Sequence, residues 1–310
     1  MSKIKRLRFV DLFCGIGGFR SAIVKAATKH GIAAKGVLAS DIDTDCQRAY
    51  LHNYGEKPLG DITKVKETDV PDHDVLLAGF PCQPFSIIGN MKGFDDTRGT
   101  LFFDIARIIK AKRPSSFVLE NVKLLVGHNE GKTLAKILVT LREMGYHVEY
   151  KVLNSLNFGL PQKRERIWIV GLRDHASFTW PEGGTRMKPL SEILEKKVHS
   201  RFTASEMIQK KRLAKYKPKT SEDLIWHENK AGNISAYPYS CTLRAGASYN
   251  YLLLNGKRRL TPREMLRLQG FPDSFEIICS DSQTRKQAGN SLPVNVAYAV
   301  LHQLIAKIKG

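Results

Sequence analysis

The sequence lacks the cysteine pattern of a disulfide-bonded or zinc-binding protein. Its cysteines are odd in number, widely spaced and without a CxxC pair; they are Cys14, Cys46, Cys82, Cys241 and Cys279. Disulfide frameworks and structural zinc sites need even or closely spaced sets of cysteines. We therefore expect no bound metal, and at least one of these thiols is a candidate for a reactive group.

Long hydrophobic runs are also missing. No apolar stretch approaches the roughly 20 residues that a membrane-spanning helix needs. After the basic start of the chain, residues 7–11 are too few and too interrupted to form the hydrophobic region of a signal peptide. We therefore expect a protein of the cytosol or nucleoid, cytoplasmic and without membrane contact.

Acidic residues are scarce. The 310 residues include 49 Lys and Arg against 30 Asp and Glu, which gives a formal net charge of +19 and a pI near 9.7. Such an excess favours a polyanionic partner, because basic side chains that neutralise phosphates release counterions and so gain affinity. A basic enzyme without such a partner is the alternative at this point.

The first half of the chain alternates short apolar runs with segments of helical periodicity. The apolar runs that predict strands are residues 7–13, 36–40, 74–79, 116–120 and 166–171. The segments that predict helices are residues 19–29, 42–52, 101–110 and 131–144. This alternation predicts an α/β fold with a doubly wound, mostly parallel, Rossmann-like sheet.

The character of the sequence changes after Gly171. Residues 172–257 contain few long apolar runs, and Lys210–Lys219 holds six basic residues and no acid. Helical periodicity returns at residues 261–269 and 291–309. We expect two domains, a larger one of residues 1–171 and 285–310 and a smaller, irregular one of residues 172–284.

Glycines and acids at strand ends point to a nucleotide. Gly15, Gly17 and Gly18 follow the first predicted strand and open a helix, so the backbone can turn tightly and approach a ligand closely. Asp41 ends the second strand, where a carboxylate can accept hydrogen bonds from both ribose hydroxyls. Asp61 could hold an adenine amino group, although a solvated turn acid is the simpler interpretation of that residue alone.

A cysteine and an acid follow the next two strands. Cys82 comes after an apolar run and is flanked by Pro81 and Pro84, which restrict the backbone and disfavour a helix. It is therefore presented at the carboxyl edge of the sheet, where ligands bind in open α/β folds. Glu120 occupies the equivalent position one strand along, where a partly buried carboxyl can donate a proton. A solvated strand-end acid is the alternative for Glu120.

Charged residues alternate at the start of the last strand of this half, at Gln162, Arg164 and Arg166. The period of two in a strand places all three on one face. Such a row suits the anchoring of a phosphate or the orientation of Glu120. A solvated edge strand is the alternative.

Together these groups suit the methylation of carbon 5 of cytosine. That carbon is a poor nucleophile until a thiolate adds to carbon 6 and an acid near ring nitrogen 3 takes up the developing charge. Cys82, Glu120 and the glycine turn supply the nucleophile, the acid and a site for a sulfonium methyl donor. Because carbon 6 cannot be reached in a stacked duplex, the base must be flipped out of it.

The sequence resembles the bacterial DNA (cytosine-5-)methyltransferases of restriction–modification type. The matching motifs follow the order of that family; they are residues 11–19, 60–63, 79–86, 120–122, 162–166, 263–272 and 287–291. The resemblance implies S-adenosylmethionine as methyl donor, no metal, double-stranded DNA as substrate and a bacterial, monomeric protein. It leaves open whether a cognate restriction endonuclease is a functional partner.

The resemblance also assigns roles to residues. Cys82 attacks carbon 6, and Glu120 contacts ring nitrogen 3 and the exocyclic amine. The residues that would support these two are Asn121, Arg164 and Arg166. The residues that would line the cofactor pocket are Phe13, Gly15, Ile16, Gly17, Gly18, Asp41, Ile42, Asp61, Ile62, Phe80, Leu101 and Asn290. Two of these depart from the family, since Asp41 stands where many relatives carry Glu and Ile42 replaces an aromatic residue that often stacks on adenine.

For the DNA, the resemblance places Arg98 in the loop that closes over the flipped base and Ser86 close to the nucleophile. It places target recognition in residues 172–258, where Arg244 would either pair with a guanine or contact a phosphate. The basic residues expected at phosphates are Lys210, Lys211 and Arg212.

Three other classes were weighed. A nicotinamide dehydrogenase would explain the glycine turn but neither Cys82 nor the basic region. A transfer-RNA cytosine methyltransferase shares this chemistry, but such relatives usually carry Thr at the position of Ser86, which therefore favours DNA. A silent DNA-binding module would tolerate the loss of Cys82 or Glu120, and both are present.

Overall fold

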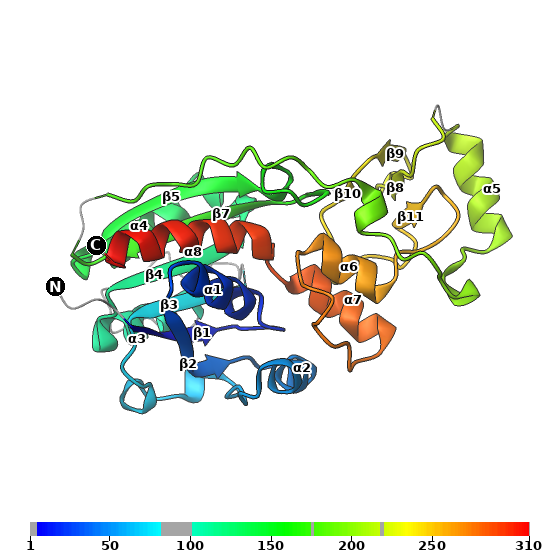
Figure 1. Cartoon of the computed structure of the whole chain (residues 1–310). Coiled ribbons are helices and arrows are strands. Elements are labelled where there is room, and N and C mark those ends of the chain that lie inside the picture. Colours follow the sequence, from blue (N-terminus) through cyan, green and yellow to red (C-terminus); the bar gives the residue numbers. More distant parts are fainter. Residues whose placement is uncertain (1–4, 82–100, 175–176, 218–219, 310) are drawn as a thin grey trace. The chain divides into compact units, whose positions relative to one another are not determined.

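The computed structural model describes residues 5–81, 101–174, 177–217 and 220–309 (Figure 1). The chain forms two compact units, which are described one at a time. Unit 1 comprises residues 1–153, 165–182 and 296–310, and unit 2 comprises residues 154–164 and 183–295.

Unit 1 is built on a six-stranded sheet in the order β2-β1-β3-β4-β7-β5. The strands are β1 (Arg6–Leu12), β2 (Ala33–Ser40), β3 (Val75–Gly79), β4 (Ser116–Val122), β5 (His147–Asn154) and β7 (Glu165–Leu172). β1 is parallel to β2 and β3, and β3 is parallel to β4, whereas β4 and β7 are antiparallel. The predicted doubly wound, mostly parallel sheet is therefore confirmed. β5 was not predicted, because only Val148 and Leu153 of it are buried and it contains no apolar run.

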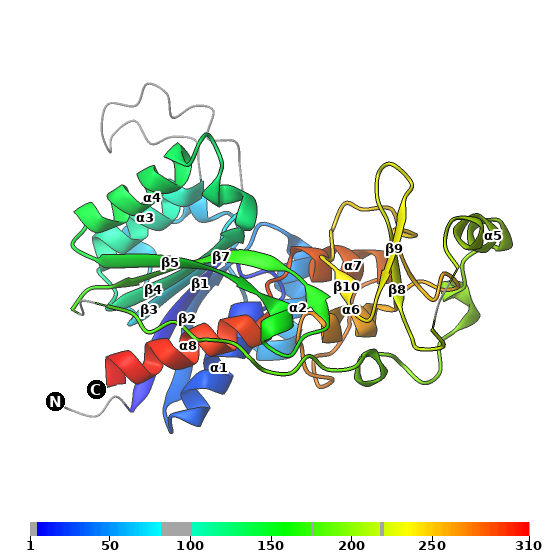
Figure 2. The same ribbon diagram turned by 90° about the horizontal axis from the view of Figure 1, so that it is seen from above.

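Helices cover both faces of this sheet. α3 (Leu101–Lys112) and α4 (Lys132–Glu143) lie on one face, and α1 (Gly18–Lys29) and α8 (Val294–Lys309) lie on the other (Figure 2). α2 (Thr44–Tyr54) follows β2 and begins with Asp43, whose carboxylate accepts hydrogen bonds from the first turn. Short 3-10 turns occur at Ile62–Lys64, Glu67–Asp69, Lys123–Val126, Ser155–Asn157, Leu190–Glu192 and Ser200–Phe202.

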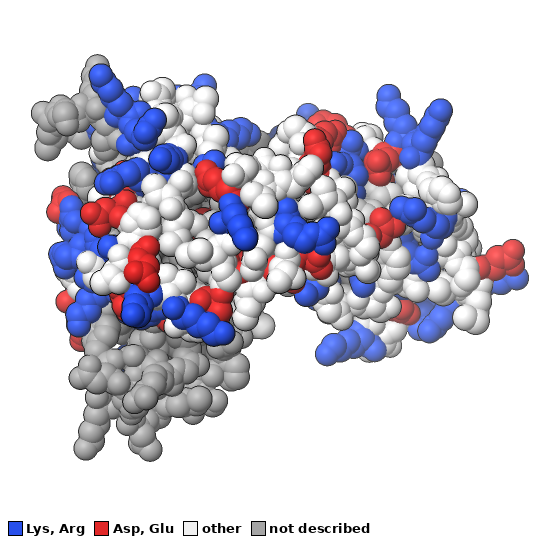
Figure 3. Space-filling view, turned by 90° about the horizontal axis from the view of Figure 1, so that it is seen from below, with Lys and Arg blue, Asp and Glu red and all other residues white. Residues whose placement is uncertain are grey.

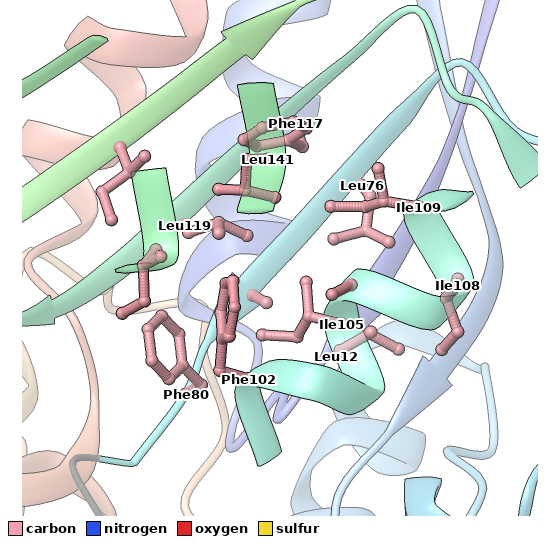
Figure 4. Packing of buried hydrophobic residues seen from close by; sticks show 14 of the residues in the cluster. Leu12, Leu76, Phe80, Phe102, Ile105, Ile108, Ile109, Phe117, Leu119 and Leu141 are labelled. Atoms are coloured by element: carbon pink, nitrogen blue, oxygen red, sulfur yellow. The ribbon is translucent and has the colours of Figure 1, made fainter. Parts of the chain in front are cut away.

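Apolar side chains fill the space between the sheet and α3 and α4. Leu12 and Leu119 from the strands pack with Phe102 of α3 and Leu141 of α4, and none of the four is more than 1% exposed (Figure 4). Phe80, the first residue after β3, joins this cluster with its ring centroid 6.1 Å from that of Phe102. The burial of Phe80 therefore fixes the path of the chain where it leaves the sheet.

The described residues of unit 2 form short strands and three α-helices. Its strands are β6 (Gln162–Lys163), β8 (Ile225–Glu228), β9 (Ile234–Tyr237), β10 (Ser240–Cys241) and β11 (Leu252–Leu254), and its helices are α5 (Glu206–Lys215), α6 (Pro262–Leu268) and α7 (Asp281–Asn290). β11, β8 and β9 form an antiparallel sheet, and β10 pairs with β6. α7 was not predicted because most of its residues are polar. Across the described ranges of both units, no helix combines the length and apolar character needed to cross a membrane.

The contact between β4 and β7 gives a test of the core. A Cβ atom added at Gly171 of β7 would lie 2.0 Å from the ring of Phe117, which is fully buried in β4. We expect Gly171→Ala to lower the free energy of unfolding by about 1–3 kcal/mol, because the ring has no space to move into. Urea denaturation followed by circular dichroism measures this change. Gly60→Ala is the control, since its added Cβ would meet nothing within 4 Å, and an equal effect of both substitutions would contradict the packing argument.

Candidate active site

The carboxyl ends of the parallel strands carry most of the predicted site of unit 1. β1 lies between β2 and β3, so the connections after β1 and β2 run to opposite sides of it. In open α/β sheets, ligands bind outside the carboxyl ends of the strands at such a reversal of strand order. Phe13 directly follows β1, and Asp41 directly follows β2.

The turn after β1 has the backbone of a nucleotide-binding turn. Phe13, Gly15 and Gly17 have positive φ angles of 55°, 53° and 85°, a region that glycine adopts without strain. A Cβ at Gly17 would collide with the ring of Tyr54 in α2. Gly17 also precedes α1 without a side-chain cap, so the first N–H groups of α1 are available to a ligand.

Asp41 connects this turn to β2. Its Oδ2 accepts a hydrogen bond from the Gly15 N–H at 2.8 Å, and its Oδ1 accepts one from the Asp43 N–H at 2.8 Å. These two bonds fix the orientation of the carboxylate. Beside it, Ile42 exposes 75% of its surface, which is unusual for an isoleucine and suits a flat apolar ligand group.

The segment that holds Asp61 lies alongside the end of β2. The Leu59 N–H donates to the Ala39 carbonyl at 2.7 Å, and the Ser40 hydroxyl donates to the Gly60 carbonyl at 2.8 Å. Asp61 accepts hydrogen bonds from the hydroxyl and the N–H of Thr63, which lower the pKa of its carboxyl. Asp61 is therefore an ionised acceptor, and the residues just before it are hydrogen-bonded to the end of β2.

Other residues expected at the cofactor have different exposures. The side chains of Ile16, Ile62 and Phe80 are buried in the core. Leu101 is half-buried at the start of α3. Asn290 is exposed at the end of α7 in unit 2. Among the described residues, no three His, Cys, Asp or Glu come together as a metal site.

A buried ion pair stands at the end of β4. Arg166 Nε lies 3.1 Å from Glu120 Oε1, and each side chain is only 11% exposed. Burial lowers the pKa of Arg166, while the Glu120 carboxylate opposes this change, and an arginine stays charged at neutral pH in either case. The pair therefore holds one carboxyl group in a fixed place at the sheet edge.

Asn121 links the ends of β3 and β4. Its side chain is buried; Nδ2 donates to the Phe80 carbonyl at 3.0 Å, and Oδ1 accepts from the Val122 N–H at 2.8 Å. In the sheet register, Gly79 lies directly opposite Glu120. Asn121 thus ties the chain just before Pro81 to the strand that carries Glu120.

Three predicted residues, Cys82, Ser86 and Arg98, lie outside the described residues. The described chain before Cys82 ends at Pro81, two residues after β3. Of the cysteines that are described, Cys14 and Cys46 are buried. Burial raises the pKa of the Cys14 and Cys241 thiols, which makes them poor nucleophiles.

The predicted row of Gln162, Arg164 and Arg166 does not form. The strand is interrupted at Arg164, because β6 pairs with β10 and β7 pairs with β4. Gln162 and Arg164 belong to unit 2, and Arg166 belongs to unit 1. The Arg164 guanidinium is buried and donates to the carbonyls of Leu243, Gly289 and Ser291, so within unit 2 it holds three backbone segments together.

The basic residues expected at DNA divide into two kinds. Lys210 and Lys211 are exposed on α5. Arg212 is 2% exposed; it forms a 2.8 Å ion pair with Glu228 and donates to the Asn250 carbonyl at 2.6 Å. Arg212 therefore supports the interior of unit 2 and offers no surface to a phosphate. Arg244 is exposed, with its guanidinium 4.8 Å from the ring centroid of Tyr251.

Tyr54 also belongs to the turn, although it was not among the predicted site residues. Its ring fills the space next to Gly17, and its hydroxyl hydrogen-bonds Ser21 at 2.7 Å and the Gly17 carbonyl at 3.2 Å. Burial raises the pKa of Tyr54, so the hydroxyl stays protonated. No local pattern reveals this role, because 37 residues separate Tyr54 from Gly17.

The chain is similar to known proteins in sequence and in fold. The chain is 54% identical over 292 residues to the Type II methyltransferase M.NgoBI of Neisseria gonorrhoeae, which covers 94% of this chain and 90% of that one. It is 51% identical over 304 residues to M.HaeII of Haemophilus aegyptius, covering 97% and 94% of the two chains. Among solved structures, the S. pombe Dnmt2 methyltransferase has the same fold, with a TM-score of 0.71, 22% identity and coverage of 98% and 99%.

A family model gives the assignment. The model of the C-5 cytosine-specific DNA methylases matches residues 7–306, which is nearly the whole chain and includes every motif named above. The chain therefore belongs to the family of C-5 cytosine-specific DNA methylases.

Proposed function

We propose that this protein methylates carbon 5 of a cytosine within a specific sequence of double-stranded DNA, with Cys82 as covalent nucleophile. The observation that carries the proposal is the buried Glu120–Arg166 pair, which stands beside the tether from Asn121 to Phe80. The ion pair fixes an acid at the end of β4, and the tether fixes the chain at Phe80, two residues before Cys82. The membership of the family supports the same reaction.

The roles of the residues follow from this chemistry. The Cys82 thiolate forms a bond to carbon 6 of the flipped cytosine, which makes carbon 5 nucleophilic. Glu120 binds ring nitrogen 3 and the exocyclic amine, so that a shared proton meets the charge that develops on the ring. Arg166 holds the carboxyl group of Glu120 in place. After methyl transfer, carbon 5 loses its proton to solvent and the bond from carbon 6 to the Cys82 sulfur breaks.

The turn after β1 fits S-adenosylmethionine, which supplies an electrophilic methyl group when bound. The uncapped start of α1 and the positive φ angles at Gly15 and Gly17 suit a close backbone contact with the ligand. Asp41 is oriented to accept from ribose hydroxyls, and the exposed face of Ile42 suits an adenine. Ile16, Ile62 and Phe80 are buried, and the remaining pocket residues of unit 1 are Phe13, Gly18, Asp61 and Leu101.

Unit 2 is proposed as the target-recognition domain. It carries 22 Lys and Arg against 10 Asp and Glu, a net charge of +12 in 124 residues. On the face shown in Figure 3, basic side chains stand between acidic ones in many places, so charge alone does not locate the DNA contact. Arg244 is the base- or phosphate-contacting candidate because it is exposed. Lys210 and Lys211 remain phosphate candidates, whereas Arg212 does not.

The relatives favour DNA over transfer RNA as substrate. M.NgoBI and M.HaeII, both above half identity, are named Type II methyltransferases, and the likeness to Dnmt2 at 22% identity concerns the fold alone. We further propose that the protein acts as a monomer in the bacterial cytoplasm and protects DNA from a cognate restriction endonuclease.

Bisulfite sequencing tests the reaction and reads the target together. In cells that express this chain, we expect cytosines to resist conversion in one short sequence context throughout the chromosome. The physical reason is that recognition by a rigid protein surface selects one pattern of base edges. Methylcytosine confined to transfer RNA, or absent altogether, would contradict the proposal.

A covalent trap tests the nucleophile. A duplex with 5-fluorocytosine at the target should remain attached to the wild-type protein in the presence of the methyl donor, because fluorine cannot leave as the proton does. Cys82→Ser should form no adduct and transfer no tritiated methyl groups, while it still binds the cofactor. Cys279→Ser, which changes a half-buried thiol of unit 2, should be trapped like the wild type. An adduct on Cys82→Ser would refute the assignment.

Asn121→Ala tests the tether between β3 and β4. The substitution removes the hydrogen bonds to Phe80 and Val122, so the nucleophile loses its fixed approach. We expect kcat to fall about 100-fold, the loss typical of a misplacement near 1 Å, with little change in the KM for the methyl donor. Asn53→Ala, which removes a bond within α2, is the control. Equal kcat values for the two variants would show that the tether has no positioning role.

A further inference from the structure

Unit 2 contains a cleft that none of the predicted roles uses. It is open to solvent, has a volume of about 560 Å³ and is lined by the apolar Phe202 and by six polar residues, Arg201, Tyr249, Ser280, Asp281, Ser282 and Arg285. These residues come from the turn at Ser200–Phe202, the loop before β11 and the first turns of α7.

Three arginines and one acid surround Tyr249 in this cleft. The guanidinium carbons of Arg259 and Arg285 lie 4.9 and 4.7 Å from the centroid of its ring. Arg201 lies 2.9 Å from Asp281. Burial raises the pKa of the Tyr249 hydroxyl, Asp281 raises it further, and Arg259, Arg285 and Arg201 oppose this change. The described residues around Tyr249 thus leave two positive charges in excess.

Such an excess favours an anion. Like charges that share one ring repel each other, and a bound anion relieves this repulsion. The Ser280 and Ser282 hydroxyls, 3.2 Å apart, add hydrogen-bonding groups beside the arginines. Guanidinium groups and hydroxyls are the common protein partners of DNA phosphates.

The same arginines hold the loop that follows Arg244. Arg285 donates to the Ala247 carbonyl at 2.8 Å, and Arg259 donates to the Asn250 side-chain oxygen at 2.8 Å. α7 also packs closely on this loop, since a Cβ at Gly289 would lie 2.4 Å from the backbone nitrogen of Ala245. A group bound in the cleft would therefore be fixed relative to the loop and to Arg244 at its start.

We propose that this cleft binds one backbone phosphate of the target DNA and thereby sets the position of the Arg244–Tyr251 loop on the duplex. The inference rests on the proposed function of unit 2 in DNA recognition. In this inference Arg201 and Arg285 bind the phosphate, and the carboxylate of Asp281 weakens phosphate binding by repulsion.

Substitutions at Arg201 and Asp281 should change the affinity for DNA in opposite directions. Arg201→Gln leaves the bonds to the loop in place, because the Arg201 guanidinium contacts Asp281 and the ring of Phe202, and its carbonyl still accepts from Arg259. We expect this variant to bind the duplex about 10-fold more weakly and to reduce the slope of log affinity against log salt by about 0.9. Asp281→Asn removes the opposing charge and should bind several-fold more tightly. A purely structural role of the cleft would not produce a tighter variant.

The measurement is fluorescence anisotropy of the full-length protein on a duplex that carries the methylated sequence, over a series of salt concentrations. Lys197→Gln is the control, since it removes one exposed charge of unit 2 outside the cleft. Affinities of Arg201→Gln and Asp281→Asn that equal the control, or a weaker Asp281→Asn, would overturn the inference. Bisulfite sequencing of the wild type reports methylation independently of these affinities. Normal methylation together with unchanged affinities of the variants would refute the role of the cleft alone. Absence of methylation by the wild type would refute the proposed function.

Discussion

The site of unit 1 depends on a buried pair of opposite charges at the end of β4. Glu120 and Arg166 are almost removed from solvent, where an unpaired charge would be costly, and removing one partner of such a pair typically costs 3–5 kcal/mol. The pair is weak evidence for stability, since two apolar residues could pack as well. The pair instead holds a carboxyl group at the sheet edge, where two hydrophobic side chains could neither bind a base nor share a proton with it.

The antiparallel strand makes this pair possible. The carboxyl ends of β1, β3 and β4 share one edge, and a further parallel strand would place only its own last residues there. β7 runs the other way, so its first residues reach the same edge, and Arg166 lies opposite Val122, two positions from Glu120. One reversal in a mostly parallel sheet therefore brings an arginine from the start of a strand to an acid at the end of another.

The sequence revealed those parts of the site that lie at the ends of apolar runs. The position of Asp41 after one strand and that of Glu120 near the end of another followed from the pattern of residues alone, and the sheet confirms both strands. The sequence could not reveal partners that are distant along the chain. Arg164 and Arg166 differ by two positions, yet one binds carbonyls as far away as Ser291 and the other binds Glu120. The prediction that Gln162, Arg164 and Arg166 share one face required a single strand, but the chain forms two strands here, β6 and β7.

Runs of basic residues were the least reliable indication of which side chains are exposed to a phosphate, and the reason is physical. A run of basic residues such as Lys210–Lys219 predicts exposure, but a helix turns its side chains through 100° per residue, so one of each three or four faces inward. Arg212 takes that position on α5 and meets Glu228 inside unit 2. The residues of unit 2 that do surround an open cleft come from three separate segments. Specific recognition therefore depends on which loops the interior arginines hold in place, and this arrangement becomes visible only when the chain is folded.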